Sequence, residues 1–179
     1  MDPVRIAVNS IASGLGFRTL YPQESEAPVR VDYRLRVPRQ VRLDRLGTVQ
    51  GDITVLDIEG PVSARSLSGN IVQKNVAGRL EARTLNGNVA VSLRALVDPK
   101  ASLDLDAVNG NLELILPPAP NADLELDTVA GNIEGRYAFT VSDLPGDTAQ
   151  RAHLGRGGVR VRLRTVRGNI RVTERDDLL

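Results

Sequence analysis

The chain has 179 residues, and 41% of them are apolar, which is enough to bury the core of one ordinary domain. Its formal net charge of +1 predicts no bulk attraction to nucleic acid or to an anionic membrane. Because the chain has no cysteine, disulfides, thiolate chemistry and cysteine-ligated metals are excluded. No run reaches the roughly 20 apolar residues of a membrane span, and residues 1–5 lack the basic-then-apolar order of an export signal.

Two strands are predicted in the N-terminal part of the chain, because apolar and polar residues alternate over residues 4–8 and 29–37. The second of these ends at Pro38, and Pro22 and Pro28 indicate a loop between the two. We expect residues 1–45 to form the opening coils, or a cap, of the repeats that follow.

A glycine recurs every nine residues in the segment that comes next, as Gly51, Gly60, Gly69, Gly78 and Gly87. The residues two positions before and two positions after each glycine are all aliphatic, and this period of two indicates strands. A regular series of short strands indicates stacked coils, because one unit cannot bury its apolar face until a neighbour covers it.

Alternate nine-residue units differ in the residue after the glycine, so one coil contains two units, or about 18 residues. The corner of the first type, in which Asp or Asn follows the glycine, returns at Gly110, Gly131 and Gly168 with extra residues between the copies. The sequence therefore predicts an all-β, single-stranded parallel β-helix (β-solenoid) in one domain over residues 1–179. Its parts are the opening coils or cap (1–45), regular coils (46–135), an irregular insertion (136–158), a last coil (159–173) and a tail (174–179).

The string VDYRLRVP at residues 31–38, followed by the T-[VL]-x-G-N-[IV] corners, resembles the bacterial putative-adhesin domain family of unknown function. That family is a relative of the auto-transporter adhesin head domain. The resemblance implies a single-stranded β-helix that is extracytoplasmic, in the periplasm or on the cell surface, or attached to a membrane. It carries over no catalytic residue and no cofactor.

A column of asparagines is expected where the corners stack. It contains Asn70, Asn88, Asn111, Asn132 and Asn169, with Asp52 completing it. Some nonapeptide β-helices bind calcium through repeated aspartates, but calcium prefers anionic oxygens and five of these six positions are neutral amides. We expect no metal here, and we interpret the column as structural, with the amides bonding one another and the backbone.

The charged residues bear on two further classes of function, polysaccharide cleavage and nucleic-acid binding. Seven acids lie between Lys100 and Glu134, and some parallel β-helices cleave polysaccharides. A glycosidase needs two carboxylates that face each other across a sugar, whereas these acids alternate with leucines on the outside of strands. The arginine run at residues 156–171 would suit nucleic acid, but recognition of single strands usually interleaves aromatic residues, which are nearly absent. We expect no enzymatic activity, no cofactor and no nucleic acid partner.

The irregular insertion and the arginines after it are the predicted partner-binding region, because binding residues concentrate in loops on a rigid scaffold. The candidate residues are Tyr137, Phe139, His153, Arg156, Arg160, Arg162 and Arg164. Three other interpretations stay open: the arginines pair with acids on adjoining coils, the aromatics fill the core, or the insertion caps the open end of the solenoid.

The function expected from these observations is a non-catalytic structural or interaction module of the bacterial cell envelope that docks a protein partner. The first alternative is an extrinsic accessory subunit that stabilises a larger membrane protein complex of the respiratory or photosynthetic type. The alternative from another class is a polysaccharide-binding or polysaccharide-cleaving β-helix enzyme.

Overall fold

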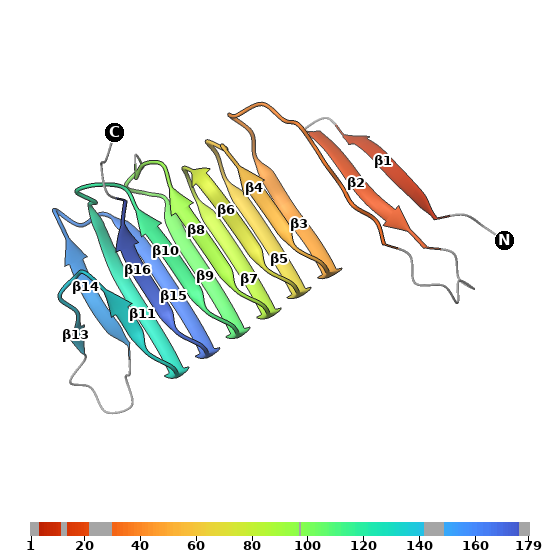
Figure 1. Cartoon of the computed structure of the whole chain (residues 1–179). Helices are drawn as coiled ribbons and strands as arrows, with labels where there is room; N and C mark the ends of the chain where they lie inside the picture. The colour runs from red at the N-terminus through yellow and green to blue at the C-terminus, as the bar shows by residue number, and fades with distance from the viewer. Residues whose placement is uncertain (1–3, 12–13, 22–29, 97, 142–148, 176–179) are drawn as a thin grey trace. The chain divides into compact units, whose positions relative to one another are not determined.

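The computed structural model describes residues 4–11, 14–21, 30–96, 98–141 and 149–175 (Figure 1). Their regular secondary structure consists of strands, so the all-β class expected from the sequence is confirmed. Within these residues no helix is long and apolar enough to cross a membrane. The chain divides into two compact units, Met1–Val37 and Pro38–Leu179. This differs from the single domain over 1–179 expected from the sequence, because the first unit makes its strand contacts within itself.

The first unit contains an antiparallel hairpin of β1 (Arg5–Ile11) and β2 (Gly14–Leu20). The strand expected at residues 4–8 therefore exists, but it pairs antiparallel with its successor and does not open a parallel stack. The strand expected at 29–37 is wrong over its described part: residues 30–37 have an alternating sequence but no hydrogen-bonded strand partner. A side-chain hydrogen bond between Thr19 and Tyr33 links this segment to β2.

The second unit contains two sheets. The eight-stranded sheet has the order β13 (Thr140–Val141), β14 (Gln150–Leu154), β11 (Ala122–Ala130), β15 (Val159–Arg167), β9 (Ser102–Asn109), β7 (Leu80–Asn86), β5 (Val62–Ser68), β3 (Leu43–Gln50). The six-stranded sheet has the order β12 (Ile133–Gly135), β16 (Ile170–Glu174), β10 (Leu112–Leu116), β8 (Val89–Leu93), β6 (Ile71–Val76), β4 (Ile53–Leu56). Apart from the antiparallel contacts of β13 and β14, all these strand pairings are parallel.

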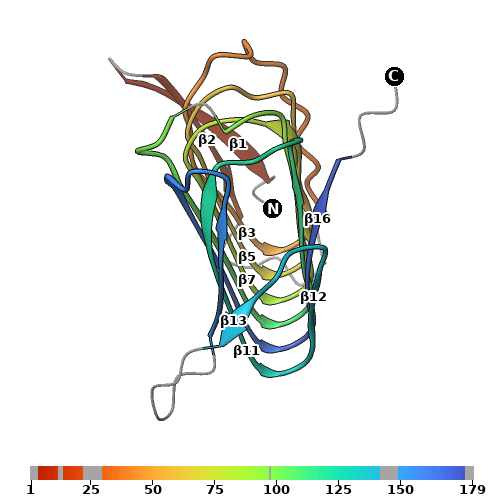
Figure 2. The same cartoon turned by 90° about the vertical axis from the view of Figure 1, so that its left-hand side faces the viewer.

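The chain passes back and forth between the two sheets, which face each other in the end-on view of Figure 2. Each of β3, β5, β7, β9, β11 and β15 is followed, after a two-residue turn, by a strand of the six-stranded sheet. We call each such combination a strand pair. Neighbouring strand pairs are in the same register over the early repeats, for example Ile53 opposite Ile71 and Leu80 opposite Val62. This offset of 18 residues is the coil length expected from the glycine spacing.

The core lies between the sheets, because alternate residues of each strand point inward. Leu80, Leu103 and Leu163 from the eight-stranded sheet and Ile71 and Leu114 from the six-stranded sheet are completely buried. Gln73 is also completely buried, and neither its amide nitrogen nor its amide oxygen has a hydrogen-bond partner among the described residues.

The order of the strands departs from the order of the sequence at the C-terminal end. The last strand pair, β15 and β16, does not stack after the others: β15 lies between β9 and β11, and β16 lies between β10 and β12 (Figure 1). The expectation that residues 159–173 form the last coil of a sequential stack is therefore wrong in its position. Between Gly131 and Gly168 the chain forms β12, β13 and β14 and then returns to pair with the other side of β11 as β15. This detour accounts for the long spacing between the two glycines.

The predicted insertion at 136–158 is more regular than expected where it is described. β14 pairs antiparallel with β11, with His153 opposite Asp123 and Arg151 opposite Glu125, and β13 pairs antiparallel with β14. These strands form the outer edge of the eight-stranded sheet. Residues 142–148 of the insertion, including Pro145, lie outside the described residues, as do residues 176–179 of the tail.

Candidate interaction surface

The asparagine column forms a continuous ladder at the turns between the two sheets. From Asp52 to Asn169 in spatial order, the side-chain oxygen of each member accepts a hydrogen bond from the backbone N–H of the next, and Asn132 is the last donor. The donor–acceptor pairs are Asn70 to Asp52 (2.7 Å), Asn88 to Asn70 (2.9 Å), Asn111 to Asn88 (2.9 Å), Asn169 to Asn111 (2.8 Å) and Asn132 to Asn169 (2.9 Å). Asn169 stands between Asn111 and Asn132, so the ladder follows the spatial order of the strand pairs. The side-chain oxygens of Asn70, Asn88, Asn111 and Asn169 are thus engaged by backbone.

The glycines of this corner stand where the backbones of neighbouring strand pairs come closest. A Cβ on Gly87 would lie 2.2 Å from the carbonyl oxygen of Gly69, and a Cβ on Gly110 would lie 1.8 Å from that of Gly87. The same collision, at 1.9–2.0 Å, is found at Gly69, Gly131 and Gly168. The second corner is also tight at Gly60, whose Cβ would lie 2.3 Å from the carbonyl oxygen of Val41, whereas at Gly78 the nearest atoms lie 3.0 Å away.

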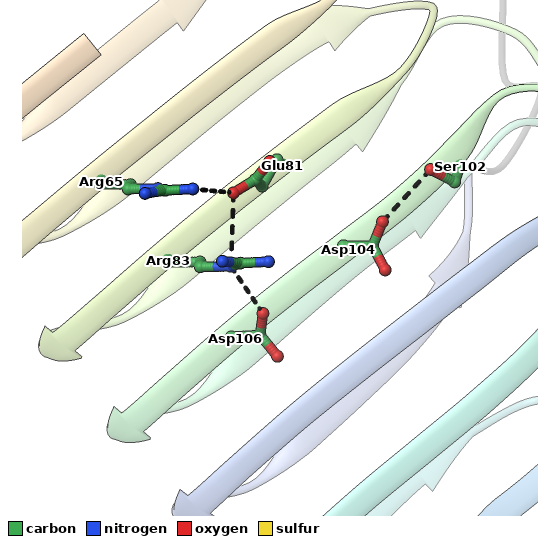
Figure 3. Close-up of polar contacts among 6 residues, drawn as sticks. All are labelled: Arg65, Glu81, Arg83, Ser102, Asp104 and Asp106. Atoms are coloured by element: carbon green, nitrogen blue, oxygen red, sulfur yellow. Dashed lines mark hydrogen bonds and ion pairs between the residues drawn. The ribbon is translucent and has the colours of Figure 1, made fainter. Parts of the chain in front are cut away.

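The outer face of the eight-stranded sheet carries charged residues in columns that run across the strands. Figure 3 shows one part, where Arg65 donates to Glu81 (2.7 Å) and Arg83 lies 3.4 Å from Glu81 and 3.1 Å from Asp106. Nearby, Ser102 donates to Asp104 (3.2 Å). The hydrogen bond from Arg65 and the charge of Arg83 hold the pKa of Glu81 below its ordinary value. These charges neutralise one another across strands.

The arginines of β15 lie between two acidic strands. Arg160, Arg162 and Arg164 stand opposite Asp123, Glu125 and Asp127 of β11. On the other side they stand opposite Ser102, Asp104 and Asp106 of β9. Glu125 is 3.3 Å from Arg162, 4.0 Å from Arg164 and 3.9 Å from Arg151. The geometry therefore matches the cross-strand pairing that the sequence had left open.

His153 lies near the end of β14, and Arg156 lies on the turn that leads from β14 to β15. The His153 ring nitrogen Nδ1 is 2.6 Å from the Asp123 carboxylate, which also accepts a hydrogen bond from the backbone N–H of Gly158 (3.1 Å). These two hydrogen bonds, that of Gly158 first, hold the pKa of Asp123 below its ordinary value. The Arg156 backbone N–H donates to Asn121 (2.8 Å), while its side chain is exposed. The turn is therefore fixed by Asn121 and Asp123, and the His153 and Arg156 side chains reach solvent.

Tyr137 and Phe139 are half-buried and pack against the core. The Tyr137 hydroxyl donates to Glu174 (3.3 Å), and burial, with the nearby charge of Glu174, raises the pKa of Tyr137 to about 12. The Phe139 ring lies so close to Gly135 that a Cβ there would be 3.0 Å from it. The structure thus separates the predicted partner-binding residues: two aromatics cover the core, Arg162 and Arg164 pair with Glu125, Arg160 stands opposite Asp123, and His153 and Arg156 remain exposed.

One feature of the outer face was missed in the sequence. The aliphatic residues two positions before the first-type glycines all point outward: Val49, Leu67, Leu85, Val108, Val166 and Val129 are between 37% and 75% exposed. The corresponding residues of the second corner, Ile58 and Val76, are buried. The signal was present, because an inward Ser or Thr precedes five of the six, which places the aliphatic residue on the other face.

No group of three or more His, Cys, Asp or Glu side chains that could hold a metal ion occurs in the described ranges. No protein-family model matches the sequence, and no curated protein matches it. Among solved structures, the chain is similar to a protein described as a "putative cell adhesion protein" from Clostridium sporogenes, with 12% identity and a TM-score of 0.48. The match covers 66% of this chain and 57% of that protein, so the chain spans less than two thirds of its length.

Proposed function

We propose that the chain is a single-stranded β-solenoid that serves as a non-catalytic interaction module of the bacterial cell envelope and docks a protein partner. The solenoid assignment is supported by the strand pairs, each of which hydrogen-bonds in parallel to its neighbours in both sheets. It is also supported by the Asn ladder, which continues through all six strand pairs. A rigid stack of this kind offers flat faces and a fixed terminal turn.

The observation that carries the docking role is the turn between β14 and β15. The backbone of the turn is held by Asn121 and Asp123, the Arg156 side chain on the turn is exposed, and the exposed ring of His153, at the end of β14, is fixed beside it by Asp123. Exposed polar and arginine side chains on a rigid support are typical of protein-binding sites, because the backbone that carries them loses little conformational entropy on binding.

The non-catalytic assignment is supported by the state of the carboxylates. A glycosidase general acid needs a raised pKa so that it carries a proton near neutral pH. Glu81 and Asp123 both have a lowered pKa. Both are held ionised by cationic or N–H neighbours, which suits a structural salt bridge better than proton donation.

The envelope location, periplasmic or on the cell surface, rests on the sequence resemblance to the adhesin domain family. Within the same class, the chain would serve instead as an extrinsic subunit that stabilises a larger membrane protein complex. A polysaccharide-binding or polysaccharide-cleaving enzyme is the alternative from another class.

The test is capture of partners from the envelope fraction of the native organism, followed by cross-linking and mass spectrometry. We expect one partner to be retained by the wild-type chain and by Arg79→Glu, an exposed arginine on a different turn, and to be lost with Arg156→Glu. Cross-links to subunits of one membrane complex would favour the accessory-subunit role. Equal capture by both variants, or cleavage of a polysaccharide that Glu81→Gln abolishes, would refute the docking proposal.

A further inference from the structure

The outward aliphatic residues form one straight ridge across the eight-stranded sheet. In spatial order they are Val49 (β3), Leu67 (β5), Leu85 (β7), Val108 (β9), Val166 (β15) and Val129 (β11). The strand registers place them at one level, since Thr84 stands opposite Ala107 and Asn86 opposite Asn109, with Leu85 and Val108 between. With strands about 4.8 Å apart, the ridge is roughly 24 Å long.

A continuous row of this kind is uncommon on a monomer, where exposed aliphatic side chains are usually scattered. Five of the six inward positions beside it hold hydroxyls, Ala107 being the exception, and those of Ser66, Thr84 and Thr165 donate to glycine carbonyls of the neighbouring strand pair. The inner side of this level thus joins the strand pairs through hydrogen bonds. On the outer side, cross-strand contacts among the aliphatic side chains contribute some stability but leave these side chains 37–75% exposed.

The surroundings of the ridge identify what could cover it. On one side lie the neutral Ser68, Asn86, Asn109 and Ala130 and one charged residue, Arg167; the amides of Asn86 and Asn109 bond each other (2.9 Å). On the other side lie arginines that already have carboxylate partners within the chain, such as Arg65 with Glu81 and Arg83 with Asp106. A partner rich in one sign of charge would gain little here, whereas an apolar partner would cover neutral or internally paired groups at these positions, apart from Arg167 near one end of the ridge.

We propose that the ridge is a self-association surface, on which a second copy of this chain packs ridge against ridge. A second copy has the same aliphatic side chains at the same strand spacing. The side chains of one ridge can therefore pack between those of the other along the whole length. An α-helix, with about 5.4 Å per turn, would drift out of step by roughly 3 Å over the same five intervals.

The expected interface is larger than the ridge itself. Six side chains of this exposure form a patch of a few hundred Å². A standard interface buries about 800 Å² on each partner, so the polar column on each side of the ridge must also be covered. In a two-fold pair the ridge and both flanking columns would be covered on each partner by the same surface of the other.

The first experiment measures the dimer dissociation constant of the full chain by sedimentation equilibrium. We expect a concentration-dependent dimer whose Kd rises at least about tenfold in Leu67→Lys and in Leu85→Lys, since central apolar residues dominate such interfaces. The matched control is Leu56→Lys on β4, which is 55% exposed against 48% for Leu67 but lies off the ridge, and its Kd should stay within about twofold of wild type. High sulfate concentrations should strengthen the dimer, because its contacts are apolar.

The second experiment uses the absence of native cysteine. Leu85→Cys should be joined to a second copy by a short bismaleimide cross-linker, and Leu56→Cys should not. A chain that stays monomeric throughout the concentration range would overturn the proposal, as would equal weakening by Leu67→Lys and Leu56→Lys. A monomer whose melting temperature falls with Leu67→Lys alone would show that the ridge is covered within one chain, which would also overturn it.

Discussion

The tight glycine corner makes a quantitative prediction that compares two positions of the same column. Gly51 and Gly87 both have a positive φ, +137° and +149°, so alanine at either position adopts a backbone conformation that L-residues avoid. The two positions differ in the space that is available to an added Cβ. The Cβ of Gly87→Ala would lie 2.2 Å from the Gly69 carbonyl oxygen, whereas the Cβ of Gly51→Ala would have nothing nearer than Thr48 Oγ1 at 3.5 Å.

The magnitudes follow from these two contributions. Backbone strain alone costs about 1–3 kcal/mol, which is the loss expected for Gly51→Ala. Gly87→Ala adds overpacking of about 1–3 kcal/mol, because the collision can be relieved only by moving two hydrogen-bonded strands apart. Among the bonds at risk is that from the Gly69 N–H to the Asn86 carbonyl (2.9 Å), which joins these two strand pairs. The total for Gly87→Ala is therefore about 2–6 kcal/mol.

The assay is urea unfolding of the two variants and the wild type, followed by circular dichroism. Because the strain is common to both, the difference between the variants isolates the contact between strand pairs. Equal losses for Gly51→Ala and Gly87→Ala would refute the close approach of Gly87 to Gly69, and with it the stacking of the corners.

Three further changes test single features of the core and the outer face. Ala107→Ser places a hydroxyl where the other strand pairs have Ser or Thr, so we expect its hydrogen bond to the Gly87 carbonyl to add about 0.5–1.5 kcal/mol of stability in urea unfolding. Gln73→Leu removes a completely buried amide without partners among the described residues, and a gain of about 1–3 kcal/mol is expected; a loss would mean that the amide is satisfied. The pKa of Glu81 is lowered in the folded chain, so ionised Glu81 stabilises the fold at a pH above 4.5, the ordinary pKa of this carboxyl. This stabilisation is lost as the pH falls below that value. Unfolding measured across this acid range should therefore show a smaller loss of stability for Glu81→Gln than for the wild type.

Local features of the fold could be predicted from the sequence, since they depend on residues a few positions apart. The nine-residue glycine spacing predicts the strands, the 18-residue offset and the corner at which Asn70 and Asn88 meet. The N-terminal strand at residues 30–37 could not be excluded in this way, because an alternating pattern does not state whether a partner strand is present. The exposed position of Leu67 and Leu85 was missed for another reason: the preceding Ser66 and Thr84 carried the signal, but an aliphatic side chain at a strand end is usually assigned to the core.

The position of β15 is the largest departure from the sequential stack, and charge offers a physical reason for it. If the strand pairs stacked in sequence order, β11 would lie beside β9, and Glu125 and Asp127 would face Asp104 and Asp106. Like charges directly opposite on neighbouring strands are destabilising. With β15 inserted, each of these acids faces an arginine. The pattern was visible in the sequence as an acid-rich segment followed by an arginine-only run, but spacing alone does not state which strands become neighbours.

This explanation predicts the effect of reversing one charge at the centre of β15. Arg162→Glu would put a carboxylate between Asp104 and Glu125, which removes two favourable cross-strand pairs and creates two unfavourable ones. At about 0.2–1 kcal/mol for each of the four changes, the loss is roughly 1–4 kcal/mol in urea unfolding at low salt.

The matched control is Arg167→Glu on the same strand, whose cross-strand neighbours Asn109 and Ala130 are neutral, and it should cost less than about 0.5 kcal/mol. Adding Glu125→Arg to Arg162→Glu should recover part of the loss, because it restores one opposite pair. If Arg162→Glu and Arg167→Glu cost equally little stability, the charges would not explain the position of β15. The insertion of β15 would then have to follow from the apolar inner face alone, where Val161 and Leu163 pack beside Leu103 and Leu105.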